Sequence, residues 1–113
     1  MSSEQLSKIS NTIKFLSADM IQSANSGHPG TPMGLSDVMS VFMSKVRHNP
    51  KNPAWLNRDR VVFSGGHASA LVYSYLYLSG YDLSMDDLKS FRRLHSKTPG
   101  HPEITTPGVE IAT

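Results

Sequence analysis

Cysteine is absent from the 113-residue sequence. Its absence excludes a disulfide framework and any metal site built on thiolates, and it fits a cytoplasmic protein, because disulfides persist mainly in oxidising compartments. Long apolar runs are lacking as well, so no segment approaches the ~20 residues that a transmembrane helix needs. The N-terminus is polar and shows no apolar signal region. From these absences we expect a cytoplasmic protein with no membrane partner.

A strong charge imbalance is also missing, since 11 Lys and Arg against 9 Asp and Glu give a net charge of +2. That balance gives no reason to expect a nucleic acid as partner. Hydrophobic residues at 38% and charged residues at 18% are ordinary for globular material, which argues against wholesale disorder. A chain of 113 residues makes at most one domain, and we expect residues 1–113 to be an incomplete one.

Helical signals dominate the first half of the chain. Ser2 and Gln5 form the pattern of a capping box, and residues 25–27 (Asn-Ser-Gly) end the helix that it opens. Between them the apolar residues recur every three or four positions, as one stripe should: Leu6, Ile9, Ile13, Leu16 and Met20. A second helix follows from Leu35 to Val46, apolar on nearly all sides, so we expect it to be buried in something larger.

The second half predicts two further helices and one strand. Residues 68–78 read as a helix closed by Gly80, and Ser84 with Asp87 forms a capping box that opens a helix through Leu94. Residues 61–64 (Val-Val-Phe-Ser) are a buried-strand candidate, and residues 109–113 look like the start of another element. One strand among helices indicates α/β layering with its neighbouring strands missing.

Three loops present a histidine beside glycine. Residues 25–34 surround His28 with three glycines and two prolines, and Pro29 pushes His28 towards an extended backbone. His101 likewise lies between glycine and proline. Histidine suits proton transfer near neutral pH, so two such loops that converge would form a polar pocket able to grip hydroxyls. The plain alternative is that glycine and proline only punctuate helices and that the histidines are solvated.

The third histidine, His67, follows Gly65 and Gly66 at the start of a predicted helix. Free backbone N–H groups at a helix start favour an anion, and glycine lets a phosphate approach closely. An ordinary tight turn before the helix would give the same pattern. A substrate phosphate could also meet the nearby cations Arg92, Arg93 and Lys97, although we expect at least two of these three to be solvated charges.

A catalytic zinc ion is the alternative use of three histidines. His28, His67 and His101 lack the i, i+4 spacing of a zinc helix, and no carboxylate pair lies nearby in the sequence. We therefore expect no metal ligands within this chain. The two other histidines, His48 and His95, read as surface or packing residues, and Trp55 with Leu56 is expected to anchor the following turn by burial.

Taken together, these motifs closely resemble the N-terminal signature of the transketolases. The resemblance runs from about Phe15 to the last residue, with small departures at Thr31 and Gly65. The stretches that carry it are 26–30 (Ser-Gly-His-Pro-Gly), 32–34 (Pro-Met-Gly), 48–50 (His-Asn-Pro), 57–60 (Asn-Arg-Asp-Arg), 64–69 (Ser-Gly-Gly-His-Ala-Ser) and 98–103 (Thr-Pro-Gly-His-Pro-Glu). It implies the first part of a thiamine diphosphate-binding parallel-sheet domain, mostly helical over residues 1–113.

The resemblance also implies a chemistry, namely transfer of a two-carbon ketol unit from a ketose phosphate to an aldose phosphate in the pentose phosphate pathway. Gly66 and His67 would bind the cofactor diphosphate. His28 would hydrogen-bond substrate hydroxyls and help to move protons, and His101 would hold the hydroxyl of the transferred unit. The thiazolium of the cofactor would perform the carbon chemistry.

Parts of the family's site are missing from the sequence. The Gly-Pro-Leu-Gly loop, the Gly-Asp-Gly segment that binds Mg2+ and the activating glutamate do not occur in it. In transketolases the cofactor also lies between two subunits of a homodimer. We therefore expect this chain to need the remainder of a transketolase chain and to be inactive alone. A dihydroxyacetone synthase-like transferase and a non-catalytic phosphate-binding stub are the alternatives.

Overall fold

The longest helix, α1 (Ser3–Ala24), begins and ends where its sequence predicts. The computed structural model describes all residues, 1–113. The Ser2 hydroxyl accepts from the Gln5 backbone N–H at 3.2 Å, and the Gln5 side chain accepts from the Ser2 N–H at 3.0 Å. Asn25 ends the helix in the left-handed conformation, with φ of 51°. The capping box and the stop signal are both confirmed.

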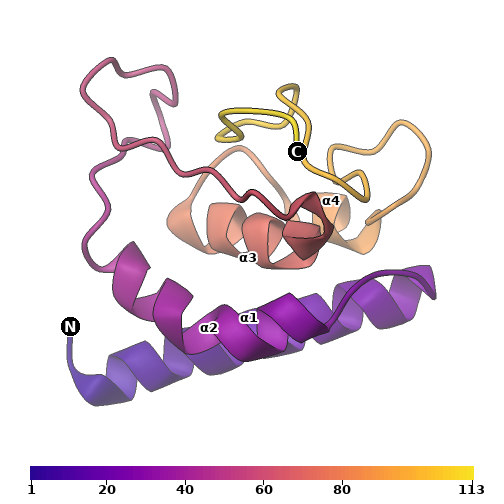
Figure 1. The fold of residues 1–113 in the computed structure, drawn as a ribbon, viewed down its shortest axis with the longest axis horizontal. Helices are drawn as coiled ribbons and strands as arrows, with labels where there is room; N and C mark the ends of the chain where they lie inside the picture. Colours follow the sequence, from indigo (N-terminus) through magenta and orange to yellow (C-terminus); the bar gives the residue numbers. More distant parts are fainter.

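Helix α2 (Gly30–Met43) lies along α1, and the two form the lower layer of the molecule (Figure 1). It starts at Gly30, earlier than the predicted Leu35, so the loop around His28 is shorter than expected. Pro32 is tolerated there because the N–H groups of a first helical turn have no intrahelical partner. Ser10 of α1 meets Ser36 of α2 at 3.0 Å between their hydroxyl oxygens, in a buried contact.

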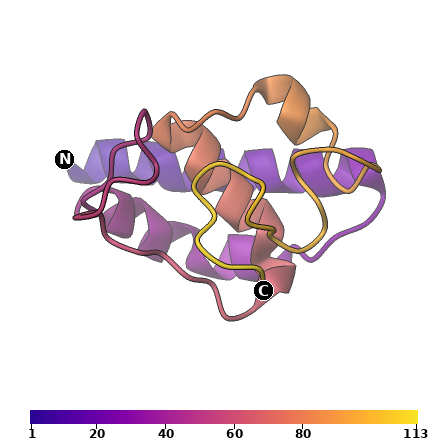
Figure 2. The same ribbon diagram turned by 90° about the horizontal axis from the view of Figure 1, so that it is seen from above.

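Helix α3 (Ser69–Ser79) crosses above α1 and α2 and forms the centre of the core (Figure 2). A single 3-10 turn, η1 (Gly66–Ala68), leads into it. Its first eight residues are all buried, and Gly80 closes it with φ of 92°, a conformation that favours glycine. The predicted helix at 68–78 is therefore confirmed. The hydroxyl oxygens of Ser17 and Ser74 lie 3.2 Å apart, and these small side chains let α1 and α3 approach closely.

Helix α4 (Met85–Lys89) is shorter than predicted. Its capping box is present, because Asp87 N–H donates to the Ser84 hydroxyl at 3.1 Å and the Asp87 carboxylate accepts from the Ser84 N–H at 2.8 Å. The expected continuation to Leu94 is wrong. The Arg92 N–H donates to the Thr98 carbonyl at 2.9 Å instead of continuing the helix, and Leu94 is 86% exposed.

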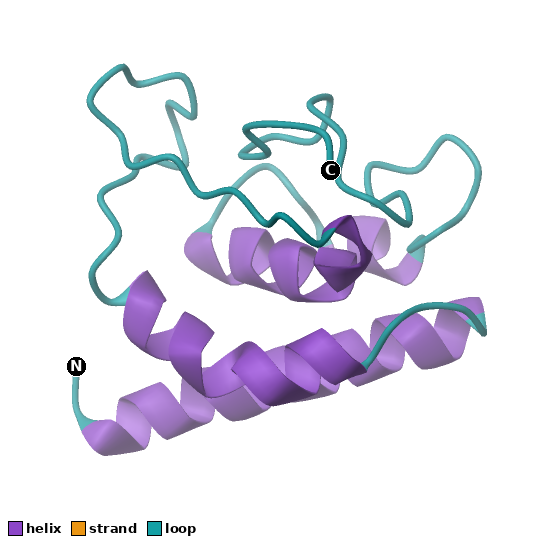
Figure 3. Cartoon of the chain, in the orientation of Figure 1, coloured by secondary structure: helices purple, strands orange, loops and turns teal.

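No strand forms in this chain (Figure 3). Residues 61–64 make no backbone–backbone hydrogen bond, so the predicted strand is wrong for the chain as described. A strand exists only through its hydrogen-bonded partners, and no second segment makes a backbone hydrogen bond to residues 61–64. Residues 109–113 likewise form no regular element.

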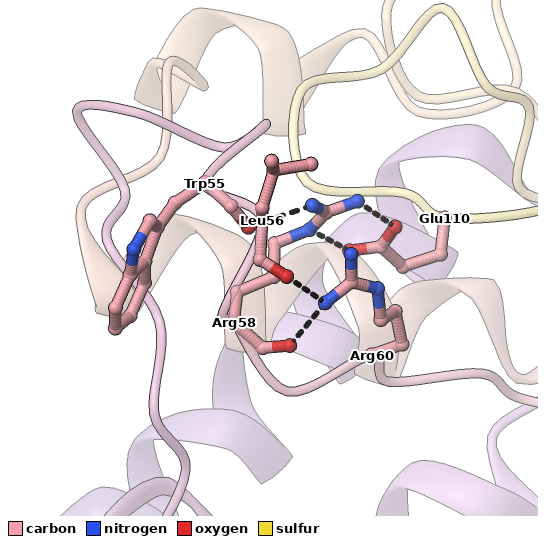
Figure 4. Close-up of polar contacts among 5 residues, drawn as sticks. All are labelled: Trp55, Leu56, Arg58, Arg60 and Glu110. Atoms are coloured by element: carbon pink, nitrogen blue, oxygen red, sulfur yellow. Dashed lines mark hydrogen bonds and ion pairs between the residues drawn. The ribbon is translucent and has the colours of Figure 1, made fainter.

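The turn at residues 55–60 is held by charge and not by burial. Trp55 is 37% exposed and Leu56 is 86% exposed, so the expected burial of this pair is wrong. Figure 4 shows what replaces it: Arg58 donates twice to the Glu110 carboxylate, at 2.8 and 2.7 Å, and once to the Trp55 carbonyl. Arg60 donates to the Leu56 carbonyl at 2.8 Å. The Arg58–Glu110 bonds connect the 55–60 turn to the C-terminal segment, and the other two bonds stabilise the turn itself.

Only part of the apolar surface of α2 is buried within this chain. Met39 is buried against the core, whereas Leu35, Val38 and Val41 are exposed. A helix apolar on most sides is normally covered all round, so this face lacks a partner within residues 1–113. None of the helices combines the length and the apolar character needed to cross a membrane.

Candidate functional site

His28 and His67 come together although 39 positions separate them in the sequence (67 − 28 = 39). Their rings meet edge to face with centroids 5.3 Å apart. His28 lies directly before α2, and His67 lies in the η1 turn before α3, so the starts of two helices bring the imidazoles into one place. Both side chains are exposed, which leaves them open to a ligand.

His101 lies at the same turn, with its ring beside the backbone of Gly66. A Cβ atom on Gly66 would lie 2.9 Å from the His101 ring and would collide with the backbone of Thr113. Only glycine fits at this position, because the His101 loop and the end of the chain press against it. The structure thus gathers all three predicted histidines around the η1 turn.

The η1 turn has the features that an anion needs. The backbone N–H groups of Gly66 and His67 have no hydrogen-bond partner in the chain. Donors of this kind at the start of a helix, with an imidazole beside them, fit a diphosphate group. The residues present therefore suit the phosphate end of a cofactor.

The His101 loop is tied to the core by hydroxyl groups that the sequence did not single out. Tyr73 of α3 donates to the Pro99 carbonyl, and Thr98 donates to the Asp87 carbonyl at 2.7 Å. Thr106 donates to the Lys97 carbonyl at 2.6 Å. Residues 90–113 contain no helix or strand, so these side-chain hydrogen bonds hold the segment in place. Nothing in the local sequence pattern signals such long-range pairs.

Of the three cations considered for a substrate phosphate, only Arg92 faces the site. Its guanidinium donates to the His28 Nδ1 atom and to the Ser26 hydroxyl, each at 3.3 Å. Arg93 is exposed and its side chain makes no hydrogen bond, whereas Lys97 lies 3.8 Å from the exposed Asp82 carboxylate. The expectation that two of the three are solvated charges is confirmed.

The remaining histidines are packing and surface residues, as expected. His48 stacks on Tyr75 with centroids 6.2 Å apart, and its Nδ1 atom lies 3.0 Å from the Tyr81 hydroxyl. Burial lowers the pKa of His48, so this ring is a neutral packing residue. His95 is exposed. No group of three His, Cys, Asp or Glu side chains in the chain is arranged to hold a metal ion.

Comparison with known proteins gives one consistent result. The family model described as the thiamine diphosphate binding domain of transketolase matches residues 5–113. Transketolase 1 of Aliivibrio fischeri is 59% identical over 107 residues, which is 93% of this chain and 16% of the relative. Transketolase 1 of Vibrio cholerae is 58% identical over 108 residues, or 94% of this chain and 16% of the relative. The chain thus spans about a sixth of these curated relatives.

Solved structures agree in fold as well as in sequence. The transketolase of Campylobacter jejuni superimposes with a TM-score of 0.99 at 70% identity, over 100% of this chain and 18% of that one. A Pichia stipitis transketolase in complex with sedoheptulose-7-phosphate gives a TM-score of 0.93 at 55% identity, over 99% and 17%. The predicted fold class, the mostly helical part of an α/β cofactor-binding domain, is confirmed. The chain belongs to the family of transketolase thiamine diphosphate-binding domains.

Proposed function

We propose that residues 1–113 act as part of a transketolase that moves a two-carbon ketol unit between sugar phosphates. The single observation that carries the proposal is the gathering of His28, His67 and His101 around the η1 turn. Three exposed imidazoles beside unpaired backbone donors suit a substrate rich in hydroxyls and a cofactor that ends in phosphate.

The four residues divide into a pair that binds the cofactor and a pair that acts on the substrate. Gly66 and His67 hold the diphosphate of thiamine diphosphate, through the free N–H groups of η1 and the imidazole. His28 and His101 are the catalytic and substrate-binding residues, which hydrogen-bond hydroxyls of the transferred unit and exchange protons with them. Thiamine diphosphate bound there would supply the thiazolium chemistry of carbon transfer, while the chain orients the reactants and keeps the histidines in place.

Family membership supports the rest of the proposed assembly. We assign the Mg2+ ligands to the remainder of the transketolase chain, because no metal-binding cluster lies within residues 1–113. The partners are sugar phosphates and the second subunit of a homodimer, with the cytoplasm and the pentose phosphate pathway as the setting. The 113-residue chain alone is then inactive.

The test is His28→Ala in a full-length transketolase that carries residues 1–113. Because His28 acts on substrate hydroxyls and not on the diphosphate, kcat should fall by about 100-fold or more, within the usual range for general acid–base groups. The dissociation constant for thiamine diphosphate, measured by calorimetry in the presence of Mg2+, should stay nearly unchanged. His95→Ala removes an exposed histidine outside the site and should leave both values alone.

A collapse of cofactor binding in His28→Ala, with normal turnover at saturating cofactor, would show that the roles of His28 and His67 are assigned wrongly. Normal values of both constants would remove His28 from the site.

A further inference from the structure

Arg92 occupies a backbone conformation that residues with a side chain rarely adopt. Its φ is 63°, in the left-handed region. The strain is held by the N–H bond to the Thr98 carbonyl at 2.9 Å and by Phe91, which is buried and anchors the preceding position. Strained residues that persist in this way cluster at sites where the direction of one side chain matters.

The strained backbone directs the Arg92 guanidinium at the His28 loop. One terminal nitrogen donates to the Ser26 hydroxyl and the other to His28 Nδ1, both at 3.3 Å. The group is also held from below, since its central carbon lies 5.6 Å from the centroid of the Phe91 ring. Two bonds and a ring contact give the guanidinium one place in the structure.

Gly100 extends the same arrangement to the His101 loop. A Cβ atom on Gly100 would lie 3.1 Å from the central carbon of the guanidinium and 3.3 Å from two of its nitrogens. The backbone of Gly100 does not have a positive φ, so its conformation does not call for glycine. Glycine at this position instead leaves room for the Arg92 guanidinium. The guanidinium therefore lies between the His28 loop and the His101 loop.

The chemistry of this contact has one consequence for His28. A guanidinium carries only donors and stays protonated, so the His28 Nδ1 atom must accept. A neutral imidazole that accepts at Nδ1 carries its proton on Nε2. We propose that Arg92 is a positioning residue, which fixes His28 as the Nε2–H tautomer and sets its ring orientation. His28 then presents a hydrogen-bond donor to the substrate. Its catalytic meaning rests on the proposed function, whereas the tautomer does not.

The experiment uses a full-length transketolase that carries residues 1–113, with 15N-labelled histidine. The His28 ring signals are assigned by their loss in His28→Gln, and long-range proton–nitrogen spectra show which ring nitrogen carries the proton. We expect Nε2–H in the parent enzyme and a mixture of tautomers in Arg92→Met. Since misorientation of a reacting group is costly, kcat should fall in Arg92→Met by about 10-fold to 100-fold, with the dissociation constant for thiamine diphosphate unchanged.

Three further variants separate positioning from charge. Arg92→Lys keeps a donor and should restore part of kcat and of the Nε2–H signal. Gly100→Ala keeps every charge and places a methyl group against the guanidinium, so it should shift the His28 signals in the same sense as Arg92→Met. Arg93→Met removes the adjacent, exposed charge and should change neither the spectrum nor the kinetics.

An Nδ1–H tautomer in the parent enzyme, or an unchanged His28 spectrum in Arg92→Met, would overturn the proposal. A raised KM for phosphorylated substrates with normal kcat and an unchanged spectrum would instead make Arg92 a phosphate ligand. If Arg92→Met changes the His28 tautomer as expected but His28→Ala leaves kcat unchanged, the positioning role stands and the proposed function is refuted.

Discussion

The Arg58–Glu110 pair shows how much one residue contact controls in a chain with few regular elements. Both side chains are largely buried, with 16% and 18% exposure, and the pair is bidentate. The two hydrogen bonds from Arg58 lower the pKa of Glu110 below its ordinary value of about 4.5. A carboxyl group with a lowered pKa stabilises the folded state while it is ionised, above its ordinary pKa. That contribution is lost as the pH falls through the lowered pKa.

Glu110→Gln therefore should loosen the C-terminal segment in a pH-dependent way. At pH 7 we expect the opening free energy of the Val109 amide to fall by roughly 1–3 kcal/mol, the usual worth of hydrogen bonds to a charged group. The gap between parent and variant should begin to narrow below about pH 4.5, the ordinary pKa of a glutamate, and should close as the pH falls through the lowered pKa of Glu110 in the folded parent. Hydrogen exchange measured from pH 7 to pH 3.5 in the full-length enzyme gives both values.

The exposed Lys97–Asp82 pair supplies the control for this experiment. Its N–O distance is 3.8 Å and the Asp82 side chain is 89% exposed. Surface pairs of this kind contribute little, so Asp82→Asn should leave the Val109 exchange unchanged. A gap between parent and Glu110→Gln that stays constant with pH would show that the charge of Glu110 does not hold the segment.

Among the elements, α4 depends most on its cap. With five residues it is too short to be stable by helix propensity, and it is held by the Ser84 capping box, by buried Leu88 and by the bond from Thr98. The same short helix leads into the strained Arg92 backbone, so the cap supports the site from a distance.

Ser84→Ala removes the side-chain acceptor for the Asp87 N–H and should lower the opening free energy of the α4 amides by about 1 kcal/mol. Hydrogen exchange of residues 85–90 measures this change. Ser23→Ala, on exposed α1 surface and without a side-chain hydrogen bond, should leave those amides alone. Unchanged exchange in Ser84→Ala would mean that packing of Leu88 alone holds α4.

At the scale of the whole molecule, the uncovered face of α2 is the main feature. Val38 is 63% exposed, and the hollow between α2 and residues 61–63 is lined by apolar side chains only. Contiguous apolar surface of this kind mediates association. The face continues onto Val62, so the segment predicted as a strand belongs to the same surface.

The 113-residue chain by itself should therefore self-associate at micromolar concentration. Replacing Val38 and Val41 by lysine should shift it towards the monomer in sedimentation velocity, because the two charges interrupt the apolar face. Leu94→Lys changes an exposed apolar residue that does not line this hollow and should not alter the distribution. A monomeric parent chain at these concentrations would contradict the argument.

Local chemistry was enough to predict much of this protein from its sequence. The capping boxes at Ser2 and Ser84 and the stop at Gly80 depend on neighbours within four residues, so the pattern contains all that is needed. The same holds for the Gly-flanked histidines, whose combined motifs identified the family.

Tertiary structure decided the rest, because the causes lie far apart in the chain. The end of α4 depends on the Thr98 carbonyl, and residues 61–64 form no strand because no other segment makes backbone hydrogen bonds to them. The guanidinium of Arg92 reaches His28 across 64 positions, and Gly100 makes room for it. Spacing along a sequence does not encode which distant groups will meet, so these contacts became visible only in the folded chain.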